Sequence, residues 1–162
     1  MNNEVDESHD AHVKGAKPGL LLNTVTNELF SELYVINIHF TEDFVIWRKR
    51  EKGGGLVGSF TDGNEATKYV EDLDGTPADY EIIQTHSHLL LRKDPETGNL
   101  IGTPFLMDFA SSKLRVSREW NTQIAQLGGD RFSSLWKVSS VKTQNRAGQP
   151  FHNLSVENQG WV

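Results

Sequence analysis

One short segment of the chain combines an aromatic ring, a cluster of positive charge and a run of glycines. Trp47 is followed by four cations and three consecutive glycines, namely Arg48, Lys49, Arg50, Lys52, Gly53, Gly54 and Gly55. Proteins bind single-stranded nucleic acid by stacking bases on aromatic rings and by placing cations against the phosphates. Glycines allow a close approach to a phosphate, and these three are expected to flex around the bound strand. The segment therefore favours a nucleic-acid-binding surface; the alternative is a core tryptophan beside a solvated strand end.

A second group of cations falls on a segment with helical periodicity, at Lys113, Arg115 and Arg118. Residues three apart share a side of a helix, so Arg115 and Arg118 are expected to form a rail along a backbone-binding groove. Trp120 lies on the apolar face of the same helix, which favours a place in the core. Aromatic residues also alternate with cations in later segments. We expect one or more of them to stack bases together with Trp47, the candidates being Phe60, Trp136 and Phe151.

Two histidines, His86 and His88, share one face of an expected strand. Their spacing would suit two ligands of a metal ion. A third ligand would have to come from His39, Asp108 or His152, and no pattern ties any of these to the pair. The sequence favours histidines that face solvent or an interface, and we expect neither a metal nor another cofactor.

No arrangement of catalytic residues stands out in the sequence. The glycine run is not followed by the Gly-Lys-Ser/Thr of a mononucleotide-binding loop. Neither a Gly-x-Ser-x-Gly nor a His-Glu-x-x-His motif is present. We therefore expect a binding protein without catalytic residues, not an enzyme.

The composition is that of one globular domain with an unevenly distributed charge. The chain has 162 residues, 36% of them hydrophobic, and no cysteine, which fits a reducing compartment. Its apolar runs are too short to cross a bilayer and its acidic N-terminus does not resemble a signal sequence, so a cytoplasmic protein without a membrane partner is expected. The net charge is −6, but residues 113–162 hold seven Lys or Arg against three Asp or Glu. Local charge decides what a groove attracts.

The sequence pattern predicts a tail followed by a single folded domain. Residues 1–19 are polar and acidic and are expected to form a disordered tail, and residues 20–162 a single β-rich binding domain. Strands are predicted at Leu33 to Phe40, Phe44 to Arg50, Leu56 to Phe60, Tyr80 to Arg92, Ile101 to Phe109, Ser134 to Thr143 and Phe151 to Glu157. Helices are predicted at Asn64 to Asp72 and at Ser111 to Leu127, the second ended by a pair of glycines.

The order of these elements narrows the fold class to mainly β, that is, β-rich α+β. Strands and helices do not alternate, which excludes a doubly wound parallel sheet. A small closed or half-closed barrel, or a compact sandwich, remains. An OB-like barrel has about this number of strands. We therefore expect an OB-like small barrel with one amphipathic helix before the last β-hairpin.

Three blocks of the sequence resemble a family of small bacteriophage proteins. They are LYVINIHFTEDFVIWRKREKGGGLVGSF, SSKLRVSREWNTQI and the final WKVSSVKTQNRAGQPFHNLSVENQGWV. The resemblance covers Leu22 to Val162, and proteins of that family are encoded among replication genes and described as single-stranded-DNA-binding. It implies action in the host cytoplasm with single-stranded nucleic acid and replication proteins as partners. One departure is that familiar proteins of this function end in an acidic tail, whereas this chain carries its acidic stretch at the N-terminus.

The sequence therefore favours two functions. The first is sequence-independent binding of single-stranded DNA in phage replication or recombination, by base stacking and phosphate neutralisation. The second is a protein-interaction module, such as a virion component or an inhibitor of a host protein, because the acidic segments suit docking to a basic protein surface. Whether the polymer is DNA or RNA and whether the chain forms a dimer stay open.

Overall fold

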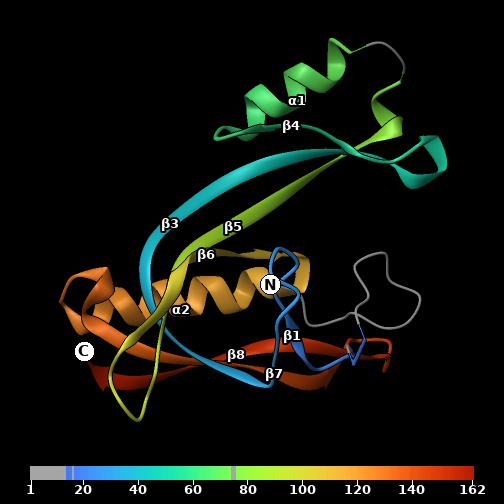
Figure 1. Cartoon of the computed structure of the whole chain (residues 1–162). Coiled ribbons are helices and arrows are strands. Elements are labelled where there is room, and N and C mark those ends of the chain that lie inside the picture. The colour runs from blue at the N-terminus through green and yellow to red at the C-terminus, as the bar shows by residue number, and fades with distance from the viewer. Residues whose placement is uncertain (1–13, 16, 74–75) are drawn as a thin grey trace.

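The computed structural model describes residues 14–15, 17–73 and 76–162, so most of the expected tail at residues 1–19 lies outside the described residues. The strands are β1 (Leu21–Leu22), β2 (Leu29–Phe30), β3 (Glu32–Arg48), β4 (Leu56–Phe60), β5 (Tyr80–Lys93), β6 (Leu100–Ala110), β7 (Ser134–Gln144) and β8 (Pro150–Trp161). The helices are α1 (Gly63–Glu71) and α2 (Leu114–Leu127) (Figure 1). Short 3-10 helices connect them at η1 (Arg50–Lys52), η2 (Pro77–Asp79), η3 (Ser111–Lys113) and η4 (Arg131–Ser133).

The longest strand, β3, runs for 17 residues where the sequence predicts two strands and a turn. One edge of β3 pairs with β5 from Val35 to Arg48. Its other edge pairs with β7 over residues 32–36 and with β4 over residues 44–47. The expected turn at residues 41–43 stays extended because each of these residues has a partner on β5. The separate strands predicted here are therefore one strand that belongs to two parts of the molecule.

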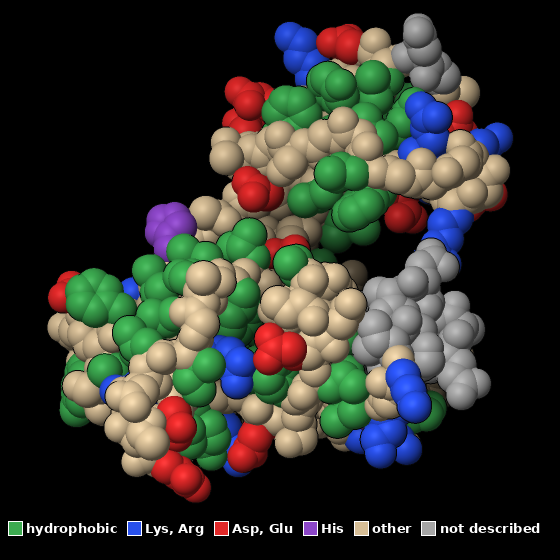
Figure 2. Space-filling view, in the orientation of Figure 1, with side chains coloured by type: hydrophobic (Ala, Val, Ile, Leu, Met, Phe, Trp, Pro, Cys, Tyr) green, Lys and Arg blue, Asp and Glu red, His purple; other side chains and the backbone are tan. Residues whose placement is uncertain are grey.

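These two parts are a body and an arm. We call residues 41–85 the arm; it contains the outer half of β3, η1, β4, α1, η2 and the first part of β5, and everything else described is the body. Figure 1 shows β3 curving past α2 and leaving the body as the arm. In the space-filling view the arm stands off the body across a narrow waist (Figure 2).

Each part has its own apolar core. In the arm, Ile46 of β3 is buried with Ala66 and Val70 of α1, which begins at the N-cap Asp62. In the body, the face of α2 that carries Trp120 and Ile124 packs on the sheet, as its periodicity predicts. The body core consists of Leu21, Leu33, Val35, Leu90, Met107, Phe109, Trp120, Ile124, Trp136, Val138 and Leu154. The core place expected for Trp120 is confirmed.

The mainly β class is confirmed, with α2 between β6 and the last hairpin, but the sheet is not a closed barrel. Its six strands follow the order β6-β5-β3-β7-β8, with β4 also on β3, and the described strands β6 and β8 do not pair with each other. Closure of a barrel requires such pairing. Instead α2 contacts both of these edge strands and occupies the space inside the curved sheet. The expected OB-like barrel therefore stays open.

In the described part of the chain, neither helix has the length and apolar character needed to cross a membrane.

Candidate nucleic-acid-binding site on the arm

The aromatic and basic segment forms the tip of the arm, where β3 turns into β4. Trp47 is 40% exposed, and its partner across the β3–β4 pair, Leu56, is 64% exposed. The three glycines of the turn have φ angles of 103°, 66° and 101°, which side-chain-bearing residues rarely adopt. The Gly54 amide donates to the Lys49 carbonyl at 3.0 Å, and the Arg48 amide donates to the Gly55 carbonyl at 2.9 Å. The glycines thus form a turn that two backbone hydrogen bonds close.

Some cations of the tip contact other side chains of the arm and others make no ion pair with a described residue. The guanidinium carbon of Arg48 lies 5.6 Å from the centre of the Tyr80 ring, and Lys52 Nζ lies 3.8 Å from Asp79 Oδ1. Lys49 and Arg50 make no ion pair with any residue that the structure describes. Residues 47–55 contain four Lys or Arg and one Glu, a local net charge of +3 in a chain of net charge −6. Asp79, which pairs with Lys52, and Glu81, which stands opposite Trp47, reduce this local charge to +1, so the tip is weakly positive.

The second group of cations meets the base of the arm through Arg118. Arg118 Nη2 donates to Gln84 Oε1 on β5 at 3.4 Å, whereas Arg115 Nε donates to Glu119 Oε1 on its own helix at 2.9 Å. Gln84 stands opposite Phe44, four residues before Arg48 on the same face of β3. At about 3.3 Å per residue, the strand position that Arg118 contacts lies about 13 Å from Arg48 along the arm. Of the expected rail, Arg118 therefore reaches the arm, whereas Arg115 pairs with Glu119 on the exposed surface of α2.

The additional aromatic candidates lie in three different places, away from Trp47. Trp136 is fully buried and lies edge-on to Trp120 in the body core, so the expectation that it stacks a base is wrong. Trp136 lies on the face of β7 that α2 covers, and the local sequence does not reveal which face is covered. Phe60 packs on Tyr69, with ring centres 5.1 Å apart, as part of the arm core. Phe151 lines a shallow hollow with Lys113, away from the tip, on β8.

The two histidines singled out in the sequence form part of a buried hydrogen-bond chain. Ser117 Oγ of α2 lies 2.8 Å from His86 Nδ1 and 2.7 Å from His88 Nε2. His88 Nδ1 lies 2.8 Å from Asn37 Nδ2, and His86 Nε2 lies 2.8 Å from Glu42 Oε2. Of these residues only Glu42 reaches the surface, since the exposure of the others is 3% or less. The expectation that the histidines face solvent or an interface is wrong, because α2 covers their face of β5.

The residues at the end of this buried hydrogen-bond chain determine which atoms carry its protons. Arg131 donates to Asn37 Oδ1 at 3.4 Å, so the amide nitrogen of Asn37 points at His88 and donates to its Nδ1. His88 Nε2 then donates to Ser117, and the Ser117 hydroxyl donates to His86. His88 is neutral in this arrangement. Burial is the main cause that lowers the pKa of His88 from 6.5 to about 3, with smaller contributions from Arg131 and His86.

The serine, histidine and glutamate of the hydrogen-bond chain follow one another as in a nucleophilic triad, but their surroundings indicate a structural role. Ser117 is fully buried, so no substrate reaches its hydroxyl. His88 stacks on Trp120 at 4.6 Å between ring centres, inside the body core. The sequence carried one signal for this chain, because Ser117 lies three residues before Trp120 and therefore on the buried side of the helix. The chain fixes the base of the arm against α2.

Comparison with known proteins identifies the family. A family model described as Pam3 phage gp34-like protein matches residues 1–162. The chain belongs to this phage protein family. No curated protein and no solved structure matches it. Membership of the gp34-like family confirms the bacteriophage part of the resemblance noted in the sequence, and it carries no statement about binding of DNA.

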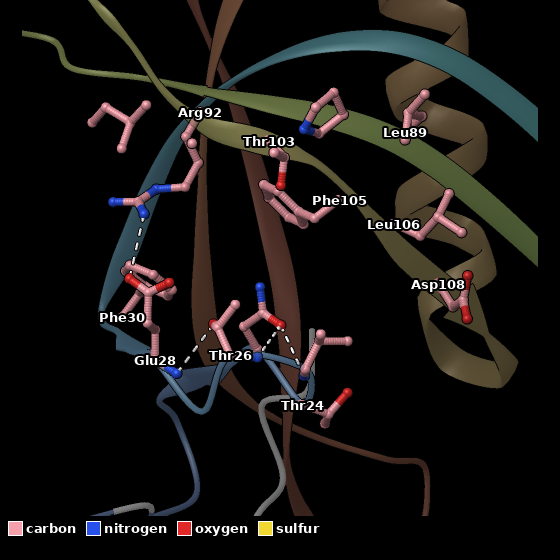
Figure 3. A pocket seen from close by; sticks show the side chains of 15 residues that line it. Thr24, Thr26, Glu28, Phe30, Leu89, Arg92, Thr103, Phe105, Leu106 and Asp108 are labelled. Atoms are coloured by element: carbon pink, nitrogen blue, oxygen red, sulfur yellow. Dashed lines mark hydrogen bonds and ion pairs between the residues drawn. The ribbon is translucent and has the colours of Figure 1, made fainter.

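This gp34-like chain also has a hollow of about 610 Å³ that none of the expected site residues lines. It lies between the β1–β2 turn and strands β5 and β6 (Figure 3). Arg92 points into it, 4.4 Å above the Phe30 ring and 3.7 Å from Glu28 Oε2. Because Glu28 neutralises Arg92, the hollow offers little attraction to a phosphate, and the tip remains the stronger candidate for nucleic acid.

Proposed function

We propose that this phage protein binds single-stranded nucleic acid at the tip of its arm, in the host cytoplasm, during phage replication or recombination. The observation that carries the proposal is the exposed Trp47 beside a turn that holds four cations, two of which, Lys49 and Arg50, make no ion pair with a described residue. A base stacks on Trp47, and Lys49 and Arg50 take the adjoining phosphates. Arg48 and Arg118 lie on the other side of the β3–β5 ribbon, which faces the helices, and are outside this path.

Binding of this kind is independent of base sequence and sensitive to salt. Every base has a face that can stack, and the contribution of one aromatic side chain is about 1–3 kcal/mol. Neutralising about two phosphates, at Lys49 and Arg50, gives a slope of about −1.4 for the logarithm of the binding constant against the logarithm of salt concentration, at about −0.7 per phosphate. The net negative charge of the chain makes weak, tip-limited binding the expected result.

The test is a fluorescence-anisotropy titration of labelled poly-dT with the full chain at low and moderate salt. Trp47→Ala is expected to weaken binding by about 5- to 150-fold, the equivalent of one lost stacking contact. Trp161→Ala is the matched control, because Trp161 is 63% exposed at the end of β8 and outside the site. Absence of binding at low salt, or equal binding by the two variants, would refute the proposal.

A second candidate, a protein-interaction module such as a virion component or an inhibitor of a host protein, is favoured by a different observation. Leu56 and Leu106 are 64% and 59% exposed on strands of the sheet, near the acidic residues Glu81 and Asp108. Such surfaces suit a partner that is apolar in the centre and basic at the rim. Failure to bind poly-dT, with copurification of one virion or host protein that Leu56→Asp abolishes, would favour this function.

A further inference from the structure

Both helices lie on one face of the β3–β5 ribbon, and among the described residues neither helix covers its other face. Ile46 packs on α1, and His86 bonds to Ser117 of α2. The pairing is regular from Phe40 and His88 to Arg48 and Tyr80, so residues of even number point to the helices and residues of odd number point away. We call the side opposite the helices the bare face; it carries Thr41, Asp43, Val45, Trp47, Leu56, Ser59, Glu81, Ile83, Thr85 and Ser87. Lys49 follows β3, is extended and donates its amide to the Asp79 carbonyl, so it continues the alternation on this face beyond Trp47.

The bare face has an apolar centre and ends of different charge. Val45 and Ile83 stand opposite each other in the middle, both half-buried, and Trp47 follows them toward the tip. Asp43 lies on the side of the body, where Asp108 of β6 adds a second carboxylate that accepts from the Ser87 hydroxyl at 2.5 Å. Lys49 lies on the side of the tip. Glu81 is the one acidic residue of this face beside Trp47 among the described residues.

The bare face is complementary to a second copy of itself that runs in the opposite direction. Asp43 and Lys49 are equally far from the level of Ile46, about 10 Å to either side at about 3.3 Å per residue. If a second copy lies on the face with its strands reversed, Asp43 of each copy meets Lys49 of the other. Val45 of each copy then meets Trp47 of the other. A surface that matches itself in this way forms a closed two-fold dimer.

The size of the face sets the strength of such a contact. From Thr41 to Lys49 it is about 26 Å long, and its three strands make it about 14 Å wide. The flat area is at most about 370 Å² per copy, or about 740 Å² for the pair, which is less than a stable specific interface buries and fits a weak, transient contact. The dimer is therefore weak, with a dissociation constant in the micromolar range, and salt weakens it further because two ion pairs hold its ends.

We propose that two copies of this chain pair through the bare faces of their arms, antiparallel, about a two-fold axis at the level of Ile46. A nucleic acid is a poorer occupant of this face because its centre lies between the carboxylates of Asp43 and Glu81. The pairing covers Trp47, so it competes with the binding of nucleic acid at the tip. It does not depend on that binding, since it is measured without nucleic acid.

Sedimentation velocity of the full chain from about 1 µM to about 200 µM, at low and high salt, measures the pairing directly. A monomer–dimer equilibrium is expected. Ile83→Asp is expected to abolish it by placing charges at the centre, and circular dichroism checks that the variant is folded. Asp43→Lys and Lys49→Asp are each expected to weaken the dimer about tenfold or more, because like charges then meet.

The double variant that carries both Asp43→Lys and Lys49→Asp restores opposite charges and is expected to recover the dimer. Glu96→Lys, in the turn between β5 and β6 and away from the bare face, is the charge-matched control. A monomer at all concentrations would overturn the proposal. So would a double variant that pairs no better than the single ones, or a basic partner protein that binds the monomer and is lost on Asp43→Lys.

Discussion

Replacing Ser117 with alanine removes one hydroxyl from the centre of the hydrogen-bond chain between α2 and β5. The Nε2–H of His88 then has no acceptor, and Nδ1 of His86 has no donor, at sites where Ser117 lies 2.7 Å and 2.8 Å away. A buried polar group without its partner costs about 1–3 kcal/mol. Because both histidines are buried, with exposures of 0% and 3%, water cannot easily replace the hydroxyl. Alanine also favours a helix slightly more than serine does, which offsets about 0.5 kcal/mol.

The expected loss in the free energy of unfolding is therefore about 2–4 kcal/mol for Ser117→Ala. Urea unfolding followed by circular dichroism measures it. Thr122→Ala is the matched control on the same helix, because the hydroxyl of Thr122 is exposed and donates to the carbonyl of Arg118 within the helix. Its effect is expected to stay within about 0.5 kcal/mol. A Ser117→Ala variant as stable as the control would refute the buried chain.

Two more predictions follow from the same structure. The pKa of His88 is lowered from 6.5 to about 3 in the folded chain. Between these two values the unfolded chain therefore binds one more proton than the folded chain. The contribution of His88 to the free energy of unfolding is fully present above about pH 6.5 and falls with acidification by up to about 1.4 kcal/mol per pH unit. Denaturant melts between pH 7 and pH 5 should show this slope, and His88→Gln should remove it; an unchanged slope would contradict the neutral state of His88. Gly55→Ala places a side chain at φ 101°, where nothing lies within 4 Å of the new Cβ, so backbone strain alone is expected to lower stability by about 1–2 kcal/mol. Gly58→Ala has no such strain and serves as its control, and equal unfolding curves for the two variants would show that the turn is free to rearrange.

The proposed binding and the proposed pairing use one side chain, Trp47, for different purposes. An oligonucleotide that stacks on Trp47 should therefore shift the chain from dimer to monomer. Ile83→Asn separates the two properties, because it removes the apolar centre of the bare face and adds no charge near Trp47. A variant that loses pairing and keeps binding of poly-dT would show that the tip alone holds the nucleic acid.

Local patterns in the sequence were sufficient to predict most elements and the composition of the tip. The alternation of apolar residues marks β5 and β7, and a period of about 3.6 marks α2 and places Trp120 in the core. The cations and glycines of residues 48–55 are neighbours in the chain, so they had to gather at one turn wherever that turn lies. These features depend on contacts between residues close in sequence.

Only the tertiary structure decided which faces are covered. Alternation in β5 showed that His86 and His88 share a side, but it is α2, about 30 residues later, that covers this side and supplies Ser117. The same packing buries Trp136 and leaves Trp47 exposed, although both look alike in their local sequence. β3 stays extended through residues 41–43 because β5 satisfies its backbone, and a partner strand some 40 residues away cannot be read from those three residues. A strand assigns its side chains to two faces locally, whereas the burial of either face depends on elements that reach it from far along the chain.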